Sequence, residues 1–302
     1  MIEELDFAYG TMDDLEDIYK IVDITGWGET LDDIRQIIAN IDNKYILLIS
    51  PKSEIVGVTL AVNNGGIGFI GHVIVLPEYR GMGLGEQLMI EAINYLKFRG
   101  CKTIKLDAVH QAISLYERVG FQFELKSLRY KLDLSNDEKI NEFTNKVRKS
   151  KHKNPVKNSK VSDFEEIIKI DNKLFECNRE NYLQALFDEF PEYTFIVKDS
   201  EKKILGYSFG LVRHETLYIR AGYCKSKEIA IDLILSAIER AKSITKIVTV
   251  SLGIPEYSSL GLQALEDLGF DQTGFSTRMF WGAKSTTGNS EQFFAIGHPA
   301  KG

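Results

Sequence analysis

The sequence predicts two consecutive α+β domains, each built on a mixed, partly antiparallel and twisted sheet flanked by helices. Three observations lead to this prediction. The chain has 302 residues, about twice what a typical single domain holds. Its two halves align with each other at one constant offset of 149 residues, the separation of Gly57 from Gly206. In each half, apolar segments come partly as hairpins and partly with helices between them, which gives a mixed sheet.

The constant offset indicates an internal duplication of one domain. Four separated anchors share it: DLEDIYKI (14–21) falls on DFEEIIKI (163–170), Gly57 on Gly206, Gly120-Phe121 on Gly269-Phe270, and Arg129 on Arg278. Such a coincidence is hard to obtain by chance. Two copies, in contrast to a long array, predict two globular domains and not a solenoid.

A basic stretch separates the halves. Residues Lys146–Lys160 contain seven Lys or Arg and no acid, with Val147 and Val156 as the only apolar residues. We expect a solvated linker, because a core helix needs apolar residues at a 3.6-residue period. A patch that binds a polyanion is the alternative, although no aromatic residue offers base stacking. The predicted boundaries are 1–133, a linker at 134–160, and 161–302.

The elements of the first half follow from periodicity and turn signals. A strand at 4–8 precedes an amphipathic helix that begins at the cap signal of Thr11. The later elements are a helix at 30–40, hairpin strands at 45–50 and 55–62, a strand at 68–76, a helix at 85–98, a strand at 102–107, a short helix at 112–119 and closing strands at 121–132.

Composition excludes several classes of protein. The net charge of −6 and pI of about 5.6 argue against a nucleic-acid binder. No apolar run approaches the roughly 20 residues of a membrane span, and the start MIEELDFAYG lacks the lysines of a signal peptide. Cys101, Cys177 and Cys224 form no CxxC pair, which indicates a reducing, cytoplasmic setting. The five histidines are scattered, so we expect no metal site.

The block HVIVLPEYRGMGLGEQLMIEAI (72–93) carries the chemistry. An apolar strand leads into a loop with Gly81, Gly83 and Gly85 and then directly into a helix. Glycines let the backbone approach a ligand with its N–H groups turned inward, and a helix N-terminus favours anions. We therefore expect a phosphate-bearing ligand, with a plain glycine-rich turn as the alternative. The block is neither a P-loop nor GxGxxG.

Read as Arg80-x-x-Gly83-x-Gly85 after VLPEY, this block resembles the acetyl-CoA signature of the GNAT superfamily of N-acetyltransferases. SLYERVGF (114–121) is similar to the later Tyr-x-x-x-Gly-Phe element of that family. The resemblance covers nearly all of 1–133 and extends to the second half through the repeat. The chain resembles a tandem arrangement in which an active GNAT domain precedes a degenerate one.

The resemblance implies roles for particular residues. Main-chain groups of Val73, Ile74 and Val75 would pair with the pantetheine arm of acetyl-CoA like an added strand. Tyr116 would protonate the departing CoA thiolate, since phenol at ~10 and thiol at ~8.5 have pKa values close enough to share a proton; packing on a short helix is the alternative. The main-chain amides that would hold the diphosphate belong to Arg80, Gly81, Met82, Gly83, Leu84 and Gly85.

The general base stays open at this point. Relatives often place Glu or His at the positions of Phe69 and Gly71, which cannot titrate. His72 lies next to them, but strand alternation puts it on the opposite face, so we interpret it as structural. Asp107 and His110 are further candidates for the base and for acceptor binding, and a water relay is equally compatible with the sequence. The family often has an Asn that contacts CoA where Val109 stands.

Two further features concern the acceptor and the second half. Trp27, between two glycines in TGWG, sits where relatives line the acceptor pocket; ordinary packing is the alternative. In the second half, residues 225–234 (KSKEIAIDLI) occupy the glycine-loop register without a glycine, and Leu265 falls on the position of Tyr116. This copy should neither hold the diphosphate nor protonate a thiolate. We expect it to scaffold, to cap the acceptor site or to dimerise.

The function that follows is metal-free transfer of an acetyl group from acetyl-CoA to a primary amine of a small molecule or peptide. We expect a monomer or homodimer that binds one CoA and touches neither membrane nor nucleic acid. We expect acids such as Glu29 and Asp107 to be exposed, and exposed acids favour a cationic acceptor. The alternative from another class is a non-catalytic acyl-CoA sensor, because the strand carboxylate is missing.

Overall fold

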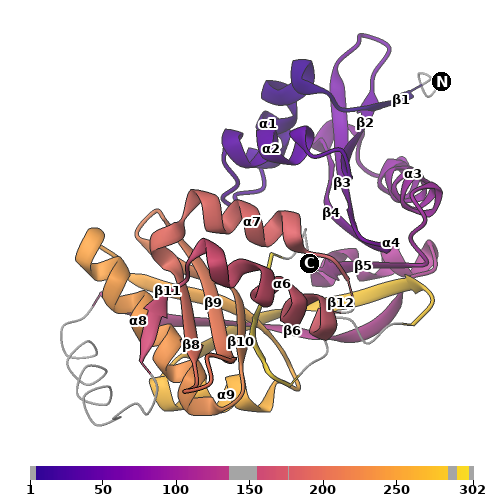
Figure 1. Cartoon of the computed structure of the whole chain (residues 1–302). Coiled ribbons are helices and arrows are strands. Elements are labelled where there is room, and N and C mark those ends of the chain that lie inside the picture. The colour runs from indigo at the N-terminus through magenta and orange to yellow at the C-terminus, as the bar shows by residue number, and fades with distance from the viewer. Residues whose placement is uncertain (1–4, 136–154, 176, 285–290, 299–302) are drawn as a thin grey trace. The chain divides into compact units, whose positions relative to one another are not determined.

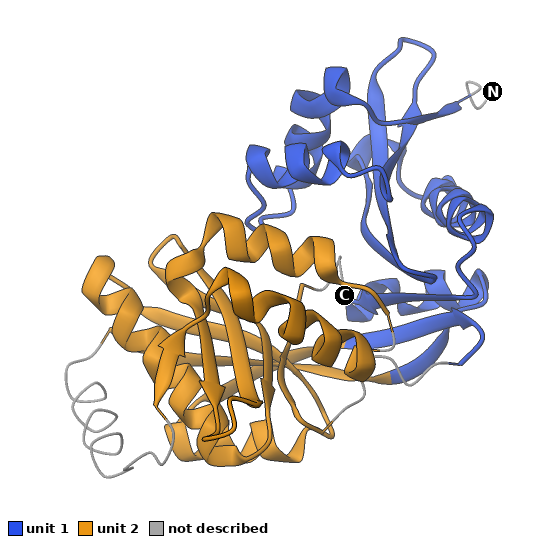
Figure 2. Cartoon of the chain, in the orientation of Figure 1, with its two compact units in different colours: residues 1–124, 277–285, 299–302 blue, residues 125–276, 286–298 orange. Residues whose placement is uncertain are grey.

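The computed structural model describes residues 5–135, 155–175, 177–284 and 291–298, and these form two compact units (Figures 1 and 2). Unit 1 holds the described residues up to Glu124 and those from Thr277 to 284. Unit 2 holds the described residues of 125–276 and residues 291–298. Each unit is an α+β structure in which helices cover a sheet, as the sequence predicts.

Unit 1 follows the predicted order of elements closely. Its strands are β1 (Asp6–Tyr9), β2 (Asn43–Ile49), β3 (Ile55–Asn64), β4 (Ile67–Val75), β5 (Thr103–Ala108) and the second half of β12 (Asp271–Gly282). Its helices are α1 (Leu15–Asp23), α2 (Leu31–Ala39), α3 (Leu84–Phe98) and α4 (Ile113–Arg118), with single 3₁₀ turns η1 (Met12–Asp14), η2 (Pro77–Tyr79) and η3 (His110–Ala112).

The sheet of unit 1 runs in the order β1-β2-β3-β4-β5-β12. All neighbours are antiparallel except β4 and β5, which are parallel. One face packs against α1 and α2 through a core that includes Ile18, Ile34 and Phe69. The other face packs against α3 and α4 through a second core that includes Leu88 and Tyr116. The sheet thus separates two hydrophobic layers.

An irregularity in β4 changes which face its residues reach. The pairing with β3 shifts between Val58 and Leu60, so His72 and Val73 together oppose a single residue, which is a β-bulge. His72 adopts a left-handed backbone conformation, with φ of 49°. Beyond the bulge, the alternation of side chains between faces is offset by one position, because a bulge inserts one extra residue into a strand.

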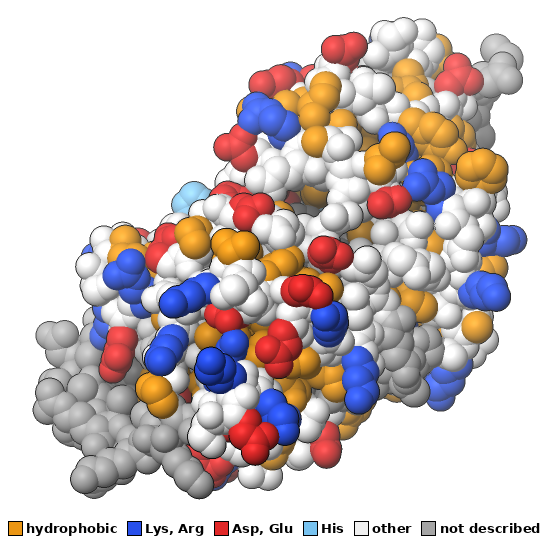
Figure 3. All heavy atoms as spheres, viewed as in Figure 1, with side chains coloured by type: hydrophobic (Ala, Val, Ile, Leu, Met, Phe, Trp, Pro, Cys, Tyr) orange, Lys and Arg blue, Asp and Glu red, His pale blue; other side chains and the backbone are white. Residues whose placement is uncertain are grey.

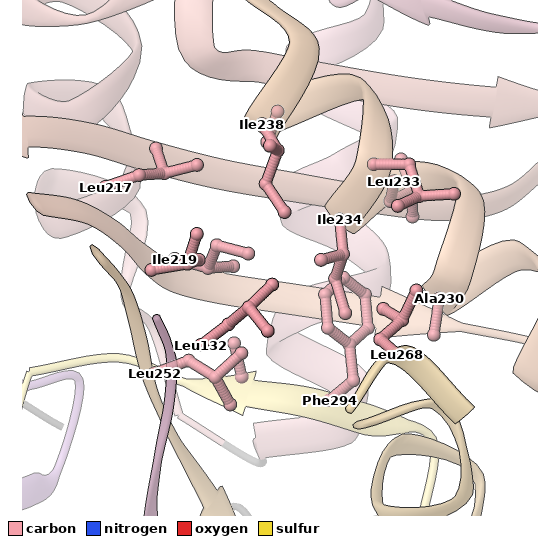
Figure 4. Packing of buried hydrophobic residues seen from close by; sticks show 14 of the residues in the cluster. Leu132, Leu217, Ile219, Ala230, Leu233, Ile234, Ile238, Leu252, Leu268 and Phe294 are labelled. Carbon is pink, nitrogen blue, oxygen red and sulfur yellow. The ribbon is translucent and has the colours of Figure 1, made fainter. Parts of the chain in front are cut away.

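Unit 2 repeats the same plan. Its strands are β6 (Gln122–Asp133), β7 (Val156–Asn158), β8 (Thr194–Lys198), β9 (Ile204–Arg213), β10 (Thr216–Cys224), β11 (Thr249–Pro255), β13 (Phe293–Ile296) and the first half of β12. Its helices are α6 (Val161–Phe175), α7 (Glu180–Glu189), α8 (Lys227–Ile244) and α9 (Ser259–Leu268), with the turn η4 (Pro191–Tyr193). The strand order is β12-β6-β11-β10-β9-β8-β7, and β13 pairs with β10. Figure 4 shows the core between α8, α9 and this sheet.

The compact units differ from the predicted boundaries at 133 and 161. Most of β6 belongs to unit 2, where Ser127–Asp133 pairs with β11. Residues Thr277–Gly282 of β12 belong to unit 1, where they pair with β5. The duplication explains this exchange physically: β6 and β12 are equivalent copies of one strand, so each can complete the sheet of the other copy.

Part of the predicted linker is a strand. Residues 136–154 lie outside the described residues, but Val156–Asn158 forms β7 and pairs with β8. The predicted closing strands at 121–132 are one strand, β6. Within the described chain, no helix is long and apolar enough to cross a membrane. Acidic and basic side chains are interspersed on the molecular face that Figure 3 shows.

Candidate functional site

The glycine loop of unit 1 joins the end of β4 to the start of α3. Gly81 and Gly83 have φ of 80° and 76°, a left-handed conformation that side chains other than glycine rarely adopt. A Cβ added at either position would meet nothing within 4 Å, so open space lies over the loop. The sequence requires glycine here for its backbone conformation, and the loop is left accessible to a ligand.

The loop offers unpaired main-chain donors. In the described chain, the N–H groups of residues 81–85 donate to no protein acceptor, whereas Glu86 and Gln87 already donate to the carbonyl of Gly83. The Arg80 guanidinium donates through Nε to the carbonyl of Val75 at 2.9 Å, which ties the loop to the end of β4. Free amides at the N-terminus of the 15-residue helix α3 form a site for an anion.

The edge of β4 continues this site toward β5. The two strands pair only from Ile67 with Thr103 to Phe69 with Lys105. Beyond Phe69, β4 runs on to Val75 and pairs with β3 alone, so the strands separate. The main chain of Val73, Ile74 and Val75 therefore has one edge that β5 does not take. An extended ligand can hydrogen-bond to such an edge as an added strand does.

Tyr116 lies on α4 with 8% of its surface exposed, packed in the same core as α3. Its ring centroid is 6.2 Å from that of Phe121. Burial raises the pKa of the Tyr116 hydroxyl to about 12. The phenol is therefore neutral and able to donate a proton throughout the physiological pH range.

A buried row of hydrogen bonds, the Tyr45–His72–Glu29 network, connects three residues that are far apart in sequence. The Tyr45 hydroxyl lies 2.7 Å from Nδ1 of His72, and Nε2 of His72 lies 2.9 Å from Oε1 of Glu29. Burial, with added contributions from Glu29 and Asp33, raises the pKa of Tyr45 well above its ordinary value. The Glu29 carboxylate accepts from Nε2–H, which leaves Nδ1 to accept from the tyrosine hydroxyl.

The prediction that His72 faces away from Phe69 is wrong. His72 bonds to Tyr45, which shares a core cluster with Phe69 on the α1–α2 side of the sheet. The bulge in β4 supplies the physical reason, because it inserts one residue and reverses the alternation at that point. The histidine thus reaches the face where the family resemblance would place a titratable group.

Trp27 lies beside the Tyr45–His72–Glu29 network, on the loop between α1 and α2. Gly26 and Gly28, with φ of 67° and 86°, turn the loop on both sides of it. Its ring is half exposed, at 50%, and stacks on His72 with centroids 5.8 Å apart. The structure therefore brings Trp27 together with Glu29 and His72, and the tryptophan presents an open aromatic face next to a carboxylate.

The side chains of Glu29 and Asp107 are buried. Glu29 is 7% exposed. Asp107 forms an ion pair with Arg278 of β12 at 2.8 Å, with both side chains almost wholly buried. The expectation that these two acids lie on the surface is therefore wrong, because partners distant in the sequence bury them. Asp107 is held by the guanidinium, whereas His110 lies exposed on η3.

Sequence reasoning missed a second buried ion pair on the same face of β5. Nζ of Lys105 lies 2.7 Å from Oε1 of Glu124, and the two side chains are 0% and 2% exposed. Lys105 and Asp107 alternate with the core residues Ile104 and Leu106, so they share the face opposite α3. The pattern of Lys105 and Asp107 within an otherwise apolar strand was the available signal.

In the described part of unit 2, a helix start stands where unit 1 has the glycine loop. β10 ends at Cys224 and α8 begins at Lys227, with two residues between them, so residues 225–234 are mostly the first turns of a helix. Leu265, at the repeat position of Tyr116, is a fully buried core residue of α9. The second copy thus has a helix and a buried leucine where the first has the glycine loop and Tyr116; that it neither holds a diphosphate nor protonates a thiolate stays a prediction. Within the described chain, no cluster of His, Cys, Asp and Glu could hold a metal ion.

Comparison with known families agrees with this architecture. Residues 12–121 match the model of the Acetyltransferase (GNAT) family, and residues 167–295 match an Acetyltransferase (GNAT) domain. The chain belongs to the GNAT family. Its organisation as two tandem GNAT domains is therefore confirmed.

Among curated relatives, GNAT members with different acceptors appear. The chain is 33% identical over 90 residues to glucosamine 6-phosphate N-acetyltransferase of Trypanosoma brucei brucei, covering 29% of this chain and 54% of that protein. It is 37% identical over 86 residues to mycothiol acetyltransferase of Arthrobacter sp., covering 26% and 27%. These matches span about half or less of each relative.

Solved structures share the fold over nearly the whole chain. A structure from Pyrococcus horikoshii aligns with a TM-score of 0.76 and 21% identity, covering 100% of this chain and 97% of that one. A tandem GNAT protein from the clavulanic acid biosynthesis pathway aligns with a TM-score of 0.68 and 12% identity, covering 93% and 99%. At these identities the likeness concerns the fold.

Proposed function

We propose that unit 1 is an acetyl-CoA-dependent N-acetyltransferase that acts on a primary amine of a small molecule or peptide. The observation that carries the proposal is the accessible loop of Gly81 and Gly83, with free amides at the N-terminus of α3 beside the open edge of β4. A diphosphate fits the first feature, and an extended, amide-bearing arm fits the second. Coenzyme A carries both on one molecule.

Tyr116 is the proton donor in this proposal. When the amine nitrogen attacks the thioester carbonyl and the C–S bond breaks, negative charge develops on the sulfur of CoA. A phenol whose pKa is about 12 stays protonated until that charge forms. The phenol proton passes to the sulfur as the C–S bond breaks, and the resulting tyrosinate takes up a proton from the medium before the next turnover.

Glu29 is the acceptor of the amine proton, directly or through one water. A primary amine has a pKa near 10.4 and reacts only in its neutral form. The buried Glu29 carboxylate is held by His72, which Tyr45 holds in turn. We treat His72 and Tyr45 as positioning residues, since each bonds to the next member of the chain. This arrangement supplies the base that Phe69 and Gly71 cannot.

Trp27 favours a cationic acceptor. Its half-exposed ring lies against His72, next to the Glu29 carboxylate. An ammonium group is attracted both by the face of an indole and by a carboxylate. The acceptor would therefore arrive protonated and lose its proton to Glu29.

A substitution at Glu29 tests this function. Glu29→Gln keeps an oxygen that can accept from His72 but removes the negative charge, so acceptor-dependent CoA release should fall about 10²–10⁴-fold. The matched control is Glu54→Gln on the exposed turn between β2 and β3, which should keep wild-type turnover. Unchanged turnover in Glu29→Gln would remove the glutamate from this role.

The same assay separates the enzyme from an acyl-CoA sensor. Thiol release from acetyl-CoA is measured against a panel of amines, amino acids, polyamines and peptides. Release that depends on an added acceptor excludes the sensor. Tight binding of acetyl-CoA without thiol release for any acceptor of the panel would overturn the proposed enzymatic function.

A further inference from the structure

The segment 291–298 of unit 2 adds a strand to β10. β13 pairs antiparallel with it, with Ala221 opposite Ile296, Gly222 opposite Ala295 and Tyr223 opposite Phe293. The N–H of Cys224 also donates to the carbonyl of Gln292 at 2.9 Å. At the offset of 149 residues, Gly222 to Cys224 are the counterparts of Val73 to Val75 in unit 1. The added strand therefore lies on the edge that is open in unit 1.

We propose that residues 291–298 are a built-in ligand of unit 2: they occupy the main-chain slot that corresponds to the acyl-CoA slot of unit 1. The name acyl-CoA slot rests on the proposed function of unit 1, whereas the occupancy in unit 2 does not. Unit 2 is then a closed GNAT domain that its own chain has filled, and not an open site that has lost affinity.

The slot is shaped for the segment. Phe293, Phe294, Ala295 and Ile296 are at most 2% exposed. A Cβ at Gly222 would lie 2.5 Å from the Phe294 ring, and one at Gly261 would lie 2.9 Å from its main chain. These two glycines make room for the segment, since a larger residue at either would collide with it. In Figure 4, the Phe294 ring lies among core residues such as Leu268 and Ile234.

Buried side chains hold the backbone of the segment at both ends. The Ser258 hydroxyl donates to the carbonyls of Phe293 and Glu291. The Arg179 guanidinium donates to the carbonyl of Ile296 at 3.1 Å and is itself fixed by Asp171. Ser258 stands at the repeat position of Val109, where the family resemblance implies a contact with CoA. The contact is thus made in unit 2 with protein instead of coenzyme.

The start of α8 carries its own cap. Ser226 caps α8 by accepting from the N–H of Ile229. The main-chain N–H of Glu228 and the Ser226 hydroxyl lower the pKa of the Glu228 carboxyl. Negative charge is favoured at a helix N-terminus, so Glu228 suits the start of α8.

Hydrogen exchange of the whole chain, with and without CoA, tests the occupancy. Amides of 293–296 and of Cys224 should exchange at least about 10²-fold more slowly than those of an exposed segment. Adding CoA should leave them unchanged. Fast exchange in this segment, or an acceleration by CoA, would show that the segment is not the resident occupant. If CoA protects no residue of unit 1, the proposed function fails while this result still stands.

Two variants test how residues 291–298 fit into their slot in unit 2, and the first has a control with the same substitution at an exposed position. Phe294→Ala should make Cys224, which is fully buried beside Gln292, accessible to thiol labelling. Phe275→Ala removes an exposed ring and should not. Cys101 of unit 1 should stay unlabelled in both, which excludes global unfolding.

The second variant, Ser258→Ala, is milder and keeps the test informative if Phe294→Ala does not fold. The loss of one hydroxyl donor should accelerate exchange at 293–296 about 3- to 10-fold. The proposal is contradicted if Cys224 stays unlabelled in a folded Phe294→Ala variant. It is also contradicted if the amides of 293–296 exchange at the wild-type rate in Ser258→Ala.

Discussion

Removal of the Tyr116 hydroxyl should separate catalysis from binding. Burial raises the pKa of this phenol to about 12, so at pH 7.5 only about one molecule in 10⁴ to 10⁵ has lost the proton. In Tyr116→Phe, kcat should fall about 10²–10⁴-fold, which is about 3–5 kcal/mol of transition-state free energy. The dissociation constant of CoA should stay within about twofold, because the ring and its packing remain.

Tyr95→Phe is the matched control. Tyr95 is also buried in the α3 core, at 7% exposure, and its ring contacts Tyr9 and the Arg99 guanidinium. Loss of the Tyr95 hydroxyl should leave kcat unchanged. The assay is acceptor-dependent thiol release, with CoA affinity measured by calorimetry.

The pH profile makes the test of Tyr116 sharper. With a pKa of about 12, the tyrosine should produce no loss of activity below about pH 11. A basic limb near pH 9 that vanishes in Tyr116→Phe would refute this assignment of its pKa. A kcat within threefold of wild type would refute its role as the donor.

Two further predictions concern binding and stability. We expect calorimetry to give one CoA site per chain; a stoichiometry near two for wild type would contradict the assignment. Gly83→Val should abolish this site, since a φ of 76° strains any β-branched residue, while Ile231→Val in α8 should not. Burial and the charge of Glu228 raise the pKa of Asp232 to about 7, above its unfolded value of ~3.9. The folded state therefore holds this proton more tightly, so stability should fall as pH rises from about 4 to 7, by at most on the order of 4 kcal/mol. In denaturation at a series of pH values, Asp232→Asn should lack this fall; an identical pH dependence would exclude Asp232 as its source.

The local features of the site could be predicted from the sequence because they depend on local chemistry. Glycines 81 and 83 are needed for their own backbone conformation, and both have positive φ. The helix that follows starts within one residue of the expected position. The degenerate loop of the second half was visible as the absence of glycine from 225–234.

The long-range features could not be predicted in this way. Glu29 and His72 are 43 residues apart, and Asp107 and Arg278 are 171 apart. The local sequence around Glu29 or Asp107 does not indicate its partner, so both acids were predicted to lie on the surface. The predicted face of His72 was wrong for a related reason. A one-residue bulge reverses the alternation of side chains between the two faces of a strand, and the bulge in β4 depends on how β3 and β4 pair.

The exchange of β6 and β12 has the same origin. A duplication makes two strands that fit either sheet equally well on sequence pattern alone. Which sheet each joins depends on the connections and on contacts such as the Asp107–Arg278 ion pair in unit 1. The repeat therefore predicts two equivalent domains, whereas the assignment of β6 and β12 to the two compact units comes from the structure.

The filled slot of unit 2 follows from what a ligand does for a binding fold. Separated strands leave main-chain donors and acceptors that must be satisfied by water, by a ligand or by protein. A copy that binds coenzyme gains stability from it only while the coenzyme is present. In the second copy the first turns of α8 replace the glycine loop, so this copy no longer gains stability from bound coenzyme. The segment 291–298 supplies this stability permanently, through paired backbone, buried Phe294 and the donors of Ser258 and Arg179. Unit 2 should therefore be as stable without CoA as with it, whereas the melting temperature of unit 1 should rise with CoA concentration.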